Sequence, residues 1–203
     1  EEASAKDENL SNHLIKKLLR SYKKIIPALE SFPDSCIITI DDDLLYHYEL
    51  VENLYASYKL HPKAISAARI HKMVLDKNSH PINYNKWEWL QTNTDKSSKL
   101  FFLTSGGGTL FPPHIFNDEI FNKTTFMEIC GTADDVWINA MSLLNDIPIY
   151  KAFTHNSTGE DYIDMNANLE PGLCLTNTNN SINRNDIQIK SVFERYHLFE
   201  KLS

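Results

Sequence analysis

The pattern of apolar and polar positions predicts helices and strands that alternate along the chain. Apolar residues recur at helical spacing, with polar residues between them, in the segments 12–29, 49–60, 132–145 and 187–199. Short apolar runs predict extended segments at 36–40, 64–69, around Val74, at 99–104 and at 109–113. This alternation predicts one α/β domain over residues 1–203, with a mostly parallel central sheet and flanking helices.

Two details of this pattern bear on the surroundings of the sheet. The run 36–40 is apolar almost throughout, which is typical of a strand buried on both faces. The helix predicted at 12–29 carries several basic residues between its apolar positions. They favour either a solvated face of a packed helix or a peripheral contact with an anionic membrane surface. Polar loops are expected at 76–85 and in the asparagine-rich stretch 176–186.

Composition narrows the class of protein. The 203 residues carry a net charge of −7, which argues against a nucleic-acid binder, since such a protein would show a basic surface. Cys36, Cys130 and Cys174 are an odd number without metal-ligand spacing, so we expect free thiols in a reducing compartment. No run approaches 18 apolar residues. We therefore expect a cytoplasmic protein, with a peripheral position at the inner membrane as the alternative.

Three adjacent aspartates directly follow the predicted strand 36–40. Like charges this close repel, so either they mark a solvated turn or a cation lies on them. Ligands of open α/β sheets bind at the carboxyl ends of strands, where Asp41, Asp42 and Asp43 fall. If the segment is extended, Asp41 and Asp43 point one way and Asp42 the other. Two such carboxylates can hold one divalent cation, or divide between a metal and a hydroxyl.

Two further motifs come later in the chain. Thr132 and Asp135 fit a capping box, and Asp134 and Asp135 lie where a helix dipole favours negative charge, so both aspartates have a structural explanation. The glycine triplet 106–108 either lets the backbone approach a ligand or forms a tight turn. It lacks the sequence of a P-loop and of a dinucleotide-binding loop.

In this order, "IITIDDDLLY", "FFLTSGGGTLFPP" and "TADDVWINAMSLL" resemble bacterial glycosyltransferases with the GT-A fold, close to the inverting family-2 enzymes of capsule and lipopolysaccharide biosynthesis. The resemblance runs from about Ser21 to Leu144. It implies a metal-dependent transfer of a sugar from a nucleotide-diphosphate donor, most simply a UDP-sugar, to a saccharide or glycolipid acceptor. Such enzymes normally begin with a βαβ unit for the nucleotide base. Only 40 residues precede Asp41 here, so part of that unit is expected to be absent or unrecorded.

The resemblance also implies roles for individual residues. Mn²⁺ or Mg²⁺ would be held by Asp43 with Asp41, and His155 is the candidate to complete the metal site. The donor would contact Asp41, Asp42, Gly106, Gly107 and Gly108. The family's acidic pair is usually Glu-Asp; here it is Asp134-Asp135, so Asp135 is the expected base and Asp134 the alternative.

Two other classes of function remain open from the residues. A metal-dependent phosphohydrolase would use the aspartates as ligands or nucleophile, but the further motifs of such enzymes are absent. A non-catalytic carbohydrate- or Ca²⁺-binding module would use the aspartates and exposed aromatic rings only to hold a sugar. Tyr84, Trp87 and Trp89 are candidates for those rings, or else for the core or the wall of a donor pocket.

Overall fold

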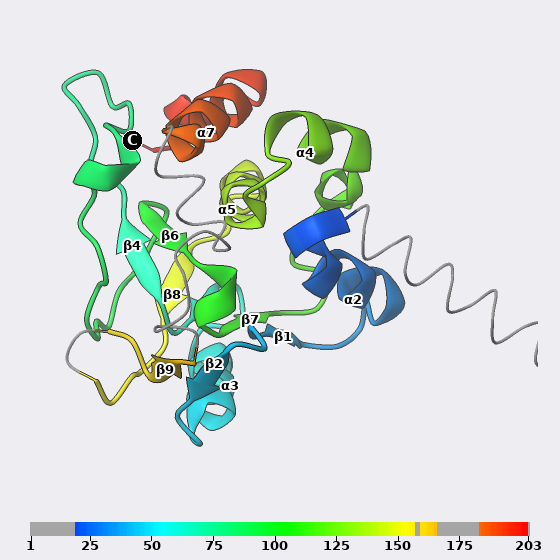
Figure 1. The fold of residues 1–203 in the computed structure, drawn as a ribbon, viewed down its shortest axis with the longest axis vertical. Helices are drawn as coiled ribbons and strands as arrows, with labels where there is room; N and C mark the ends of the chain where they lie inside the picture. The colour runs from blue at the N-terminus through cyan, green and yellow to red at the C-terminus, as the bar shows by residue number, and fades with distance from the viewer. Residues whose placement is uncertain (1–18, 157–158, 166–182, 203) are drawn as a thin grey trace, which may run out of the picture.

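The computed structural model describes residues 19–156, 159–165 and 183–202. Over these residues the protein is a mixed α/β protein with a five-stranded mixed sheet and flanking helices (Figure 1). The strands are β1 Ile37–Thr39, β2 Leu44–Tyr46, β3 Ile65–Ala67, β4 Ile70–Lys72, β5 Ser97–Ser98, β6 Phe101–Leu103, β7 Thr109–Phe111, β8 Ile149–Lys151 and β9 Tyr162–Asp164. The α-helices are α2 Ile26–Ser31, α3 Leu50–Leu60, α4 Lys123–Ile129, α5 Asp134–Leu144 and α7 Arg184–Arg195. Short 3-10 helices are η1 Arg20–Lys24, η2 Tyr84–Lys86, η3 Ser105–Gly107, η4 Asp118–Phe121 and η6 Leu198–Lys201.

The main sheet has the strand order β1-β7-β3-β8-β5. Only β3 and β8 run parallel, with Ile65 opposite Ile149, whereas the other three neighbouring pairs are antiparallel. The expected mostly parallel sheet is therefore wrong, because β7 lies between β1 and β3 and runs against both. Two smaller ladders, β2 with β9 and β4 with β6, extend the fold beside this sheet.

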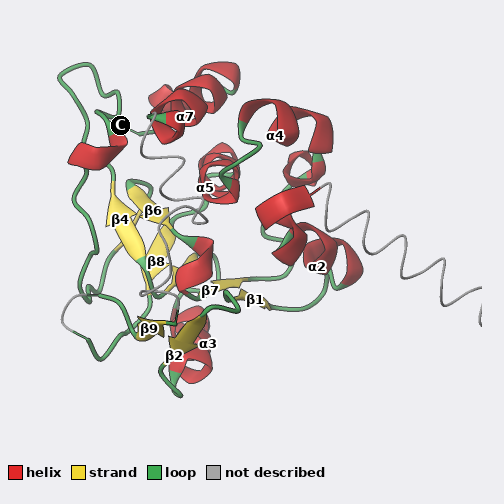
Figure 2. Ribbon diagram, in the orientation of Figure 1, coloured by secondary structure: helices red, strands yellow, loops and turns green. Residues whose placement is uncertain are grey.

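Helices cover both faces of the strands. Figure 2 shows α2, α4, α5 and α7 gathered on one side, with α3 on the other. Neighbouring residues of β7 alternate between these sides: Phe111 packs in the large core and Leu110 in the smaller cluster with Leu54 of α3. In the large core, the side chain of Asn139 in α5 bonds both the backbone N–H and the carbonyl of Leu103. That pair of bonds fixes α5 against β6, and with it the start of α5.

The predicted first helix is interrupted. Its residues up to 18 lie outside the described part, and the rest is η1 and α2, separated at Ile25. Pro27 in the first turn of α2 has no N–H to continue a helix from η1. The predicted apolar face is nevertheless present, since Tyr22, Ile25 and Ile26 are buried.

Other expectations are corrected in detail. The strand at 36–40 is not buried on both faces: β1 is an edge strand, its two isoleucines are half-buried, and Ile40 beyond its end is exposed. The asparagine-rich stretch lies outside the described residues up to 182, and its last residues begin α7. Cys130 is buried and Cys36 half-buried, both as free thiols, and Cys174 lies outside the described residues. No helix in the described ranges is long and apolar enough to cross a membrane.

Candidate functional site

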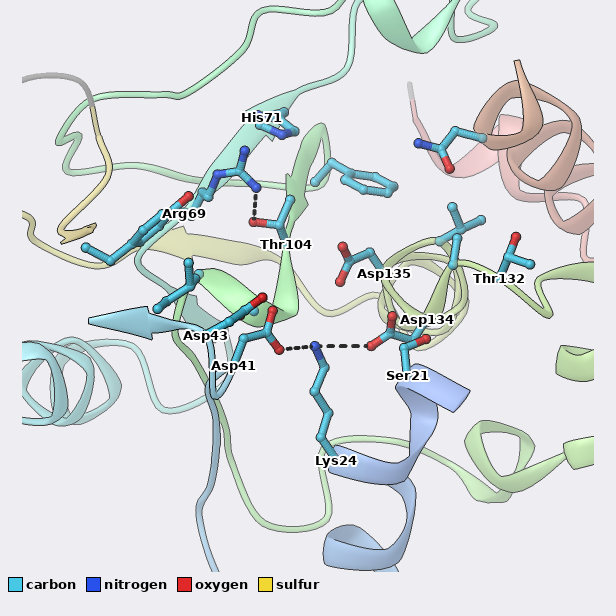
Figure 3. A pocket seen from close by; sticks show the side chains of 18 of the residues that line it. Ser21, Lys24, Asp41, Asp43, Arg69, His71, Thr104, Thr132, Asp134 and Asp135 are labelled. Carbon is cyan, nitrogen blue, oxygen red and sulfur yellow. Dashed lines mark hydrogen bonds and ion pairs between the residues drawn. The ribbon is translucent and has the colours of Figure 1, made fainter. Parts of the chain in front are cut away.

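A cavity of about 400 Å³ brings together all three motifs found in the sequence (Figure 3). Its wall contains the three aspartates after β1, two glycines of the triplet and the acidic pair at the start of α5. These segments come from distant parts of the chain. They meet because β1 is bonded to β7, which follows the glycines, and because α5 packs on β6, which precedes them.

A lysine lies between the first aspartate and the acidic pair. The Nζ atom of Lys24, from η1, is 2.8 Å from Asp41 Oδ1 and 3.7 Å from Asp134 Oδ2 (Figure 3). Burial alone would lower the pKa of Lys24, but the nearby carboxylates of Asp134, Asp135 and Asp41 together raise it. A cation therefore lies on Asp41, the first of the three aspartates, and it is a side chain of this protein.

Ser105, the first residue of η3, holds both members of the acidic pair. Its backbone N–H donates to Asp135 Oδ1 at 2.7 Å, and its hydroxyl donates to Asp134 Oδ2 at 3.1 Å. The hydroxyl of Thr39 in turn donates to the carbonyl of Ser105 at 3.1 Å. The turn between β6 and β7 thus fixes the two carboxylates relative to the end of β1.

The three glycines have different roles. A Cβ atom on Gly106 would lie 1.8 Å from Asp41 Oδ2, and one on Gly107 would lie 2.3 Å from the Cβ of Arg69. Both glycines line the cavity, where they allow these side chains to touch the backbone. Gly108 is outside the lining; its φ of +95° and its contact with Leu50 explain the glycine there by backbone geometry alone.

The expected capping box at the start of α5 is wrong. The N-cap is Ala133, without a side-chain cap, and the hydroxyl of Thr132 instead donates to Gln188 Oε1 of α7 at 3.1 Å. As expected, Asp134 and Asp135 lie in the first turn of α5, but the helix dipole does not decide the pKa of Asp135. Burial, with repulsion from Asp134, raises the pKa of Asp135 to about 6, although Lys24 and Ser105 act in the opposite direction.

The opposite wall of the cavity is aromatic and carries no net charge. Tyr84, Trp89 and Phe102 line it, together with His71 of β4. The His71 ring lies 4.4 Å from the Trp89 ring, and its Nδ1 accepts from the N–H of Leu90 at 3.1 Å. The imidazole is therefore the tautomer with a proton on Nε2. Burial, aided by the charge of Arg69, lowers the pKa of His71 to about 3, so the ring is neutral.

Three buried polar atoms on this cavity have no partner among the described residues: Ser21 Oγ, His71 Nε2 and Asn185 Oδ1. Buried polar atoms in folded proteins normally have a hydrogen-bond partner, so each such exception needs a reason. Their common position on one cavity points to a polar ligand that supplies the missing bonds. Arg69, by contrast, is paired: its Nε donates to Glu160 Oε1 at 2.9 Å and its guanidinium also donates to Thr104.

His155 does not join the strand-end aspartates. Its ring lies against His47 and Glu49, just beyond one end of the β2–β9 ladder. Asp43 is beyond the other end, where its carbonyl accepts from the N–H of Met165. His47 and Asp43 are four residues apart along this extended segment, a separation of about 13 Å. His155 therefore cannot complete a metal site on Asp43 in this structure.

A metal ion at Asp41–Asp43 would need further coordinating atoms from a bound substrate. Asp41 is paired with Lys24, and the three carboxylates do not converge on one point, being part of a turn rather than an extended strand. Mg²⁺ and similar ions are, however, commonly bound through one or two carboxylates plus substrate phosphates. Asp42 and Asp43 are exposed on the cavity wall and fit that kind of binding.

The sequence reasoning missed Lys24, Ser105, His71 and Asn185. Lys24 belongs to the basic residues expected on a solvated face or at a membrane surface, Ser105 lies in the glycine-rich motif without a predicted role, and His71 and Asn185 belong to no motif. Only the pairing of segments in the fold places them at the cavity. Comparison with known proteins finds no family model that matches this chain, and no curated protein matches it either.

Proposed function

We propose that this protein is a glycosyltransferase of the GT-A type, which moves a sugar from a nucleotide-diphosphate donor to a hydroxyl of a saccharide or glycolipid acceptor. One observation carries the proposal. A single cavity contains a carboxylate with its pKa raised to about 6, a cluster of strand-end carboxylates and a neutral aromatic wall with unpartnered polar atoms.

Asp135 is the base in this proposal. A general base works best when its pKa lies near the operating pH, and burial beside Asp134 moves the pKa of Asp135 toward that range. The acceptor oxygen attacks the anomeric carbon, the bond from that carbon to the diphosphate oxygen breaks, and the hydroxyl proton passes to Asp135. Attack and departure occur on opposite faces, so the transfer inverts the anomeric centre. The bond from Ser105 fixes the carboxylate orientation for this step.

The strand-end aspartates would serve the donor. Asp43, with Asp42 or Asp41, would hold Mn²⁺ or Mg²⁺ together with phosphate oxygens of the donor. Such an ion offsets the negative charge on the departing diphosphate. Lys24 holds Asp41 in place beside Gly106.

The neutral wall suits a sugar ring. Aromatic rings offer an apolar face to the C–H side of a sugar, and uncharged donors and acceptors match its hydroxyls. His71 Nε2–H is a donor and Asn185 Oδ1 an acceptor, and neither has a partner within residues 19–156, 159–165 and 183–202. An acceptor sugar held there would place a hydroxyl toward Asp135, which lies between this wall and Asp41 in Figure 3.

The test is release of nucleoside diphosphate by the full chain, with Mn²⁺, from a panel of UDP-, GDP- and dTDP-sugars, with and without oligosaccharide acceptors. We expect slow release from one donor and faster release with an acceptor. Asp135→Asn should abolish the faster phase, whereas Asp146→Asn, an exposed aspartate outside the cavity, should retain it. Sugar binding without release from any donor would instead indicate a carbohydrate-binding module. Release of inorganic phosphate alone would indicate a phosphohydrolase.

A further inference from the structure

A second group of metal-ligating side chains lies outside the cavity. One ligand atom from each of His47, Glu49 and His155 falls within 4.8 Å of the other two. His47 and Glu49 lie in the turn between β2 and α3, and His155 lies in the segment between β8 and β9. None of the three lines the cavity of the proposed transferase site. We propose that these residues form a binding site for a transition-metal ion such as Zn²⁺.

The orientation of His155 carries this inference. Its Nδ1 is 3.0 Å from Asp161 Oδ2, and its Nε2 is 2.8 Å from Glu49 Oε2. A histidine that binds a metal usually gives its other ring N–H to a carboxylate, which fixes the ring and its tautomer. Asp161 is placed to be that carboxylate. The Nε2 of His155 then faces Glu49, and the ring of His47 stacks on the face of the His155 ring, with the ring centres 4.0 Å apart.

Asp161 is itself held firmly for this task. Its side chain is nearly buried, and it accepts the backbone N–H groups of His155 at 2.7 Å and of Asn156 at 2.9 Å. A carboxylate anchored behind the ring by these bonds is the outer support that metal-binding histidines require.

The donor set indicates which ion fits. Two imidazole nitrogens and one carboxylate oxygen suit Zn²⁺, whereas Mg²⁺ and Ca²⁺ prefer oxygen ligands alone. Ligand atoms of tetrahedral zinc lie about 3.4 Å apart, given bond lengths near 2.1 Å. The 2.8 Å contact from His155 to Glu49 would therefore open slightly, and the wider separations within the 4.8 Å limit would close. His47 would give up a long contact, the 3.3 Å bond that its Nδ1 accepts from the N–H of Glu49.

A metal here would join two parts of the fold. It would tie the segment before β9 to the start of α3, beside the β2–β9 ladder labelled in Figure 1. The two carboxylates that contact His155 carry two negative charges, which a divalent ion neutralises. The three protein ligands leave one position for water, or for a ligand atom from outside this group.

The experiment is titration of the tag-free, chelator-treated full chain with ZnCl₂, followed by calorimetry and by metal content after gel filtration. We expect one equivalent of zinc, and a visible absorption band when Co²⁺ replaces it. His155→Ala should weaken binding by at least 100-fold, and Asp161→Asn, which acts only through His155, by roughly 10- to 100-fold.

Matched controls separate this site from the cavity. Asp43→Asn and His114→Ala, the latter an exposed histidine paired with Asp34, should bind zinc like the wild type. If His155→Ala fails to fold by circular dichroism, His47→Ala replaces it, because the His47 ring is half-exposed. The proposal is overturned if the wild type takes up no zinc, if neither histidine variant weakens binding, or if Asp43→Asn abolishes it. Transferase activity plays no part in these readouts.

Discussion

Asp135→Asn should make the protein more stable at neutral pH while it removes the proposed base. The pKa of this carboxyl rises from an ordinary 3.8 to about 6 in the folded protein, because it is buried beside Asp134. The ionised form of Asp135 therefore destabilises the folded state, and each pKa unit of this shift corresponds to about 1.4 kcal/mol. Asparagine removes the charge and keeps an oxygen that accepts the Ser105 N–H. It also gives up the attraction of Lys24, so we expect a gain of roughly 1 to 3 kcal/mol at pH 8.

The sign of this effect sets its pH dependence. Because the pKa is raised on folding, the stability that Asp135 contributes is complete below its unfolded pKa of 3.8 and is lost as the pH rises through about 6. The wild type thus loses stability relative to Asp135→Asn as the pH increases. Between about pH 4.5 and pH 8 the advantage of Asp135→Asn should grow by roughly 1 to 2 kcal/mol. Above this range it should stay constant.

Urea unfolding at the two pH values measures the effect, with turnover measured on the same samples. The control is Asp146→Asn, where hydrogen bonds from Lys201 and Lys99 lower the pKa of the carboxyl to about 2. The stability that the Asp146 carboxylate contributes is present above its unfolded pKa of 3.8 and is lost only as the pH falls toward about 2. Asp146→Asn should therefore be less stable than the wild type at both pH values. The reasoning fails if Asp135→Asn is less stable than the wild type at pH 8, or if its advantage does not change with pH.

Three further predictions concern the same cavity. Gly106→Ala should displace Asp41 and abolish nucleotide-dependent turnover with little change in melting temperature. Gly108→Ala, at a φ of +95°, should instead lower the free energy of unfolding in urea by about 1 to 3 kcal/mol. Equal stability losses in the two variants would contradict this. Lys24→Met removes the cation beside Asp41 and Asp134, which are partly solvated or still bonded to Ser105, so it should cost about 1 to 2 kcal/mol. It should also shift the pH–rate profile to higher pH, and an unchanged profile would refute this prediction. His71→Asn keeps an acceptor at the Nδ1 position. The pKa of His71 falls from 6.5 to about 3 on folding, so the wild type should lose stability relative to this variant as the pH falls below 6.5. Urea unfolding at pH 7 and pH 5 tests this, and an equal difference at both pH values would disprove it.

Two of the three motifs carried local signals of their place in the fold, whereas the meeting of all three was implied only by the family resemblance. A strand that ends in aspartates places them at an edge of the sheet, and a glycine triplet between two apolar runs places a tight turn where strands meet. Both signals depend on a few neighbouring residues, and the structure puts Asp41, Gly106 and Asp135 on one cavity. The helix predicted at 49–60 follows its period, because α3 buries only the face that carries Leu50 and Leu54. The helix predicted at 132–145 forms as α5, but it is buried on almost every side and not on one apolar face alone.

Strand direction was not predictable in the same way. β3 and β7 are buried at every position, so their residues read alike whichever way the strand runs. The alternation of helices and strands suggested parallel pairing, but only the short 3-10 helix η3 separates β6 from β7. β6 pairs with β4 in a separate ladder, whereas β7 joins the main sheet between β1 and β3 and runs antiparallel to both. The direction of β7 therefore depends on its pairing with segments that are distant in the sequence, which the residues of one strand do not encode.

Lys24 shows why charged contacts at a site are hard to read from sequence. In an unbroken helix its position falls on the polar face, and that assignment holds only while the helix continues. The break at Ile25 turns η1 toward the cavity, where Ser21 and Lys24 both become part of the wall. His155 misled in the opposite direction: its order in the chain suggested the aspartates, whereas the β2–β9 ladder carries it to His47.

One lysine among three carboxylates leaves the centre of the cavity with unbalanced negative charge. Lys24 pairs with Asp41 and Asp134, so Asp135 ionises without a partner of its own beyond the hydrogen bond from Ser105. Burial, with repulsion from Asp134, raises the pKa of Asp135, and the excess negative charge also makes the cavity favourable for a cation that arrives with a substrate. A second lysine would stabilise the fold but would hold Asp135 ionised at lower pH and weaken it as a base. The stability lost at this one carboxylate is therefore inseparable from the chemistry proposed for it.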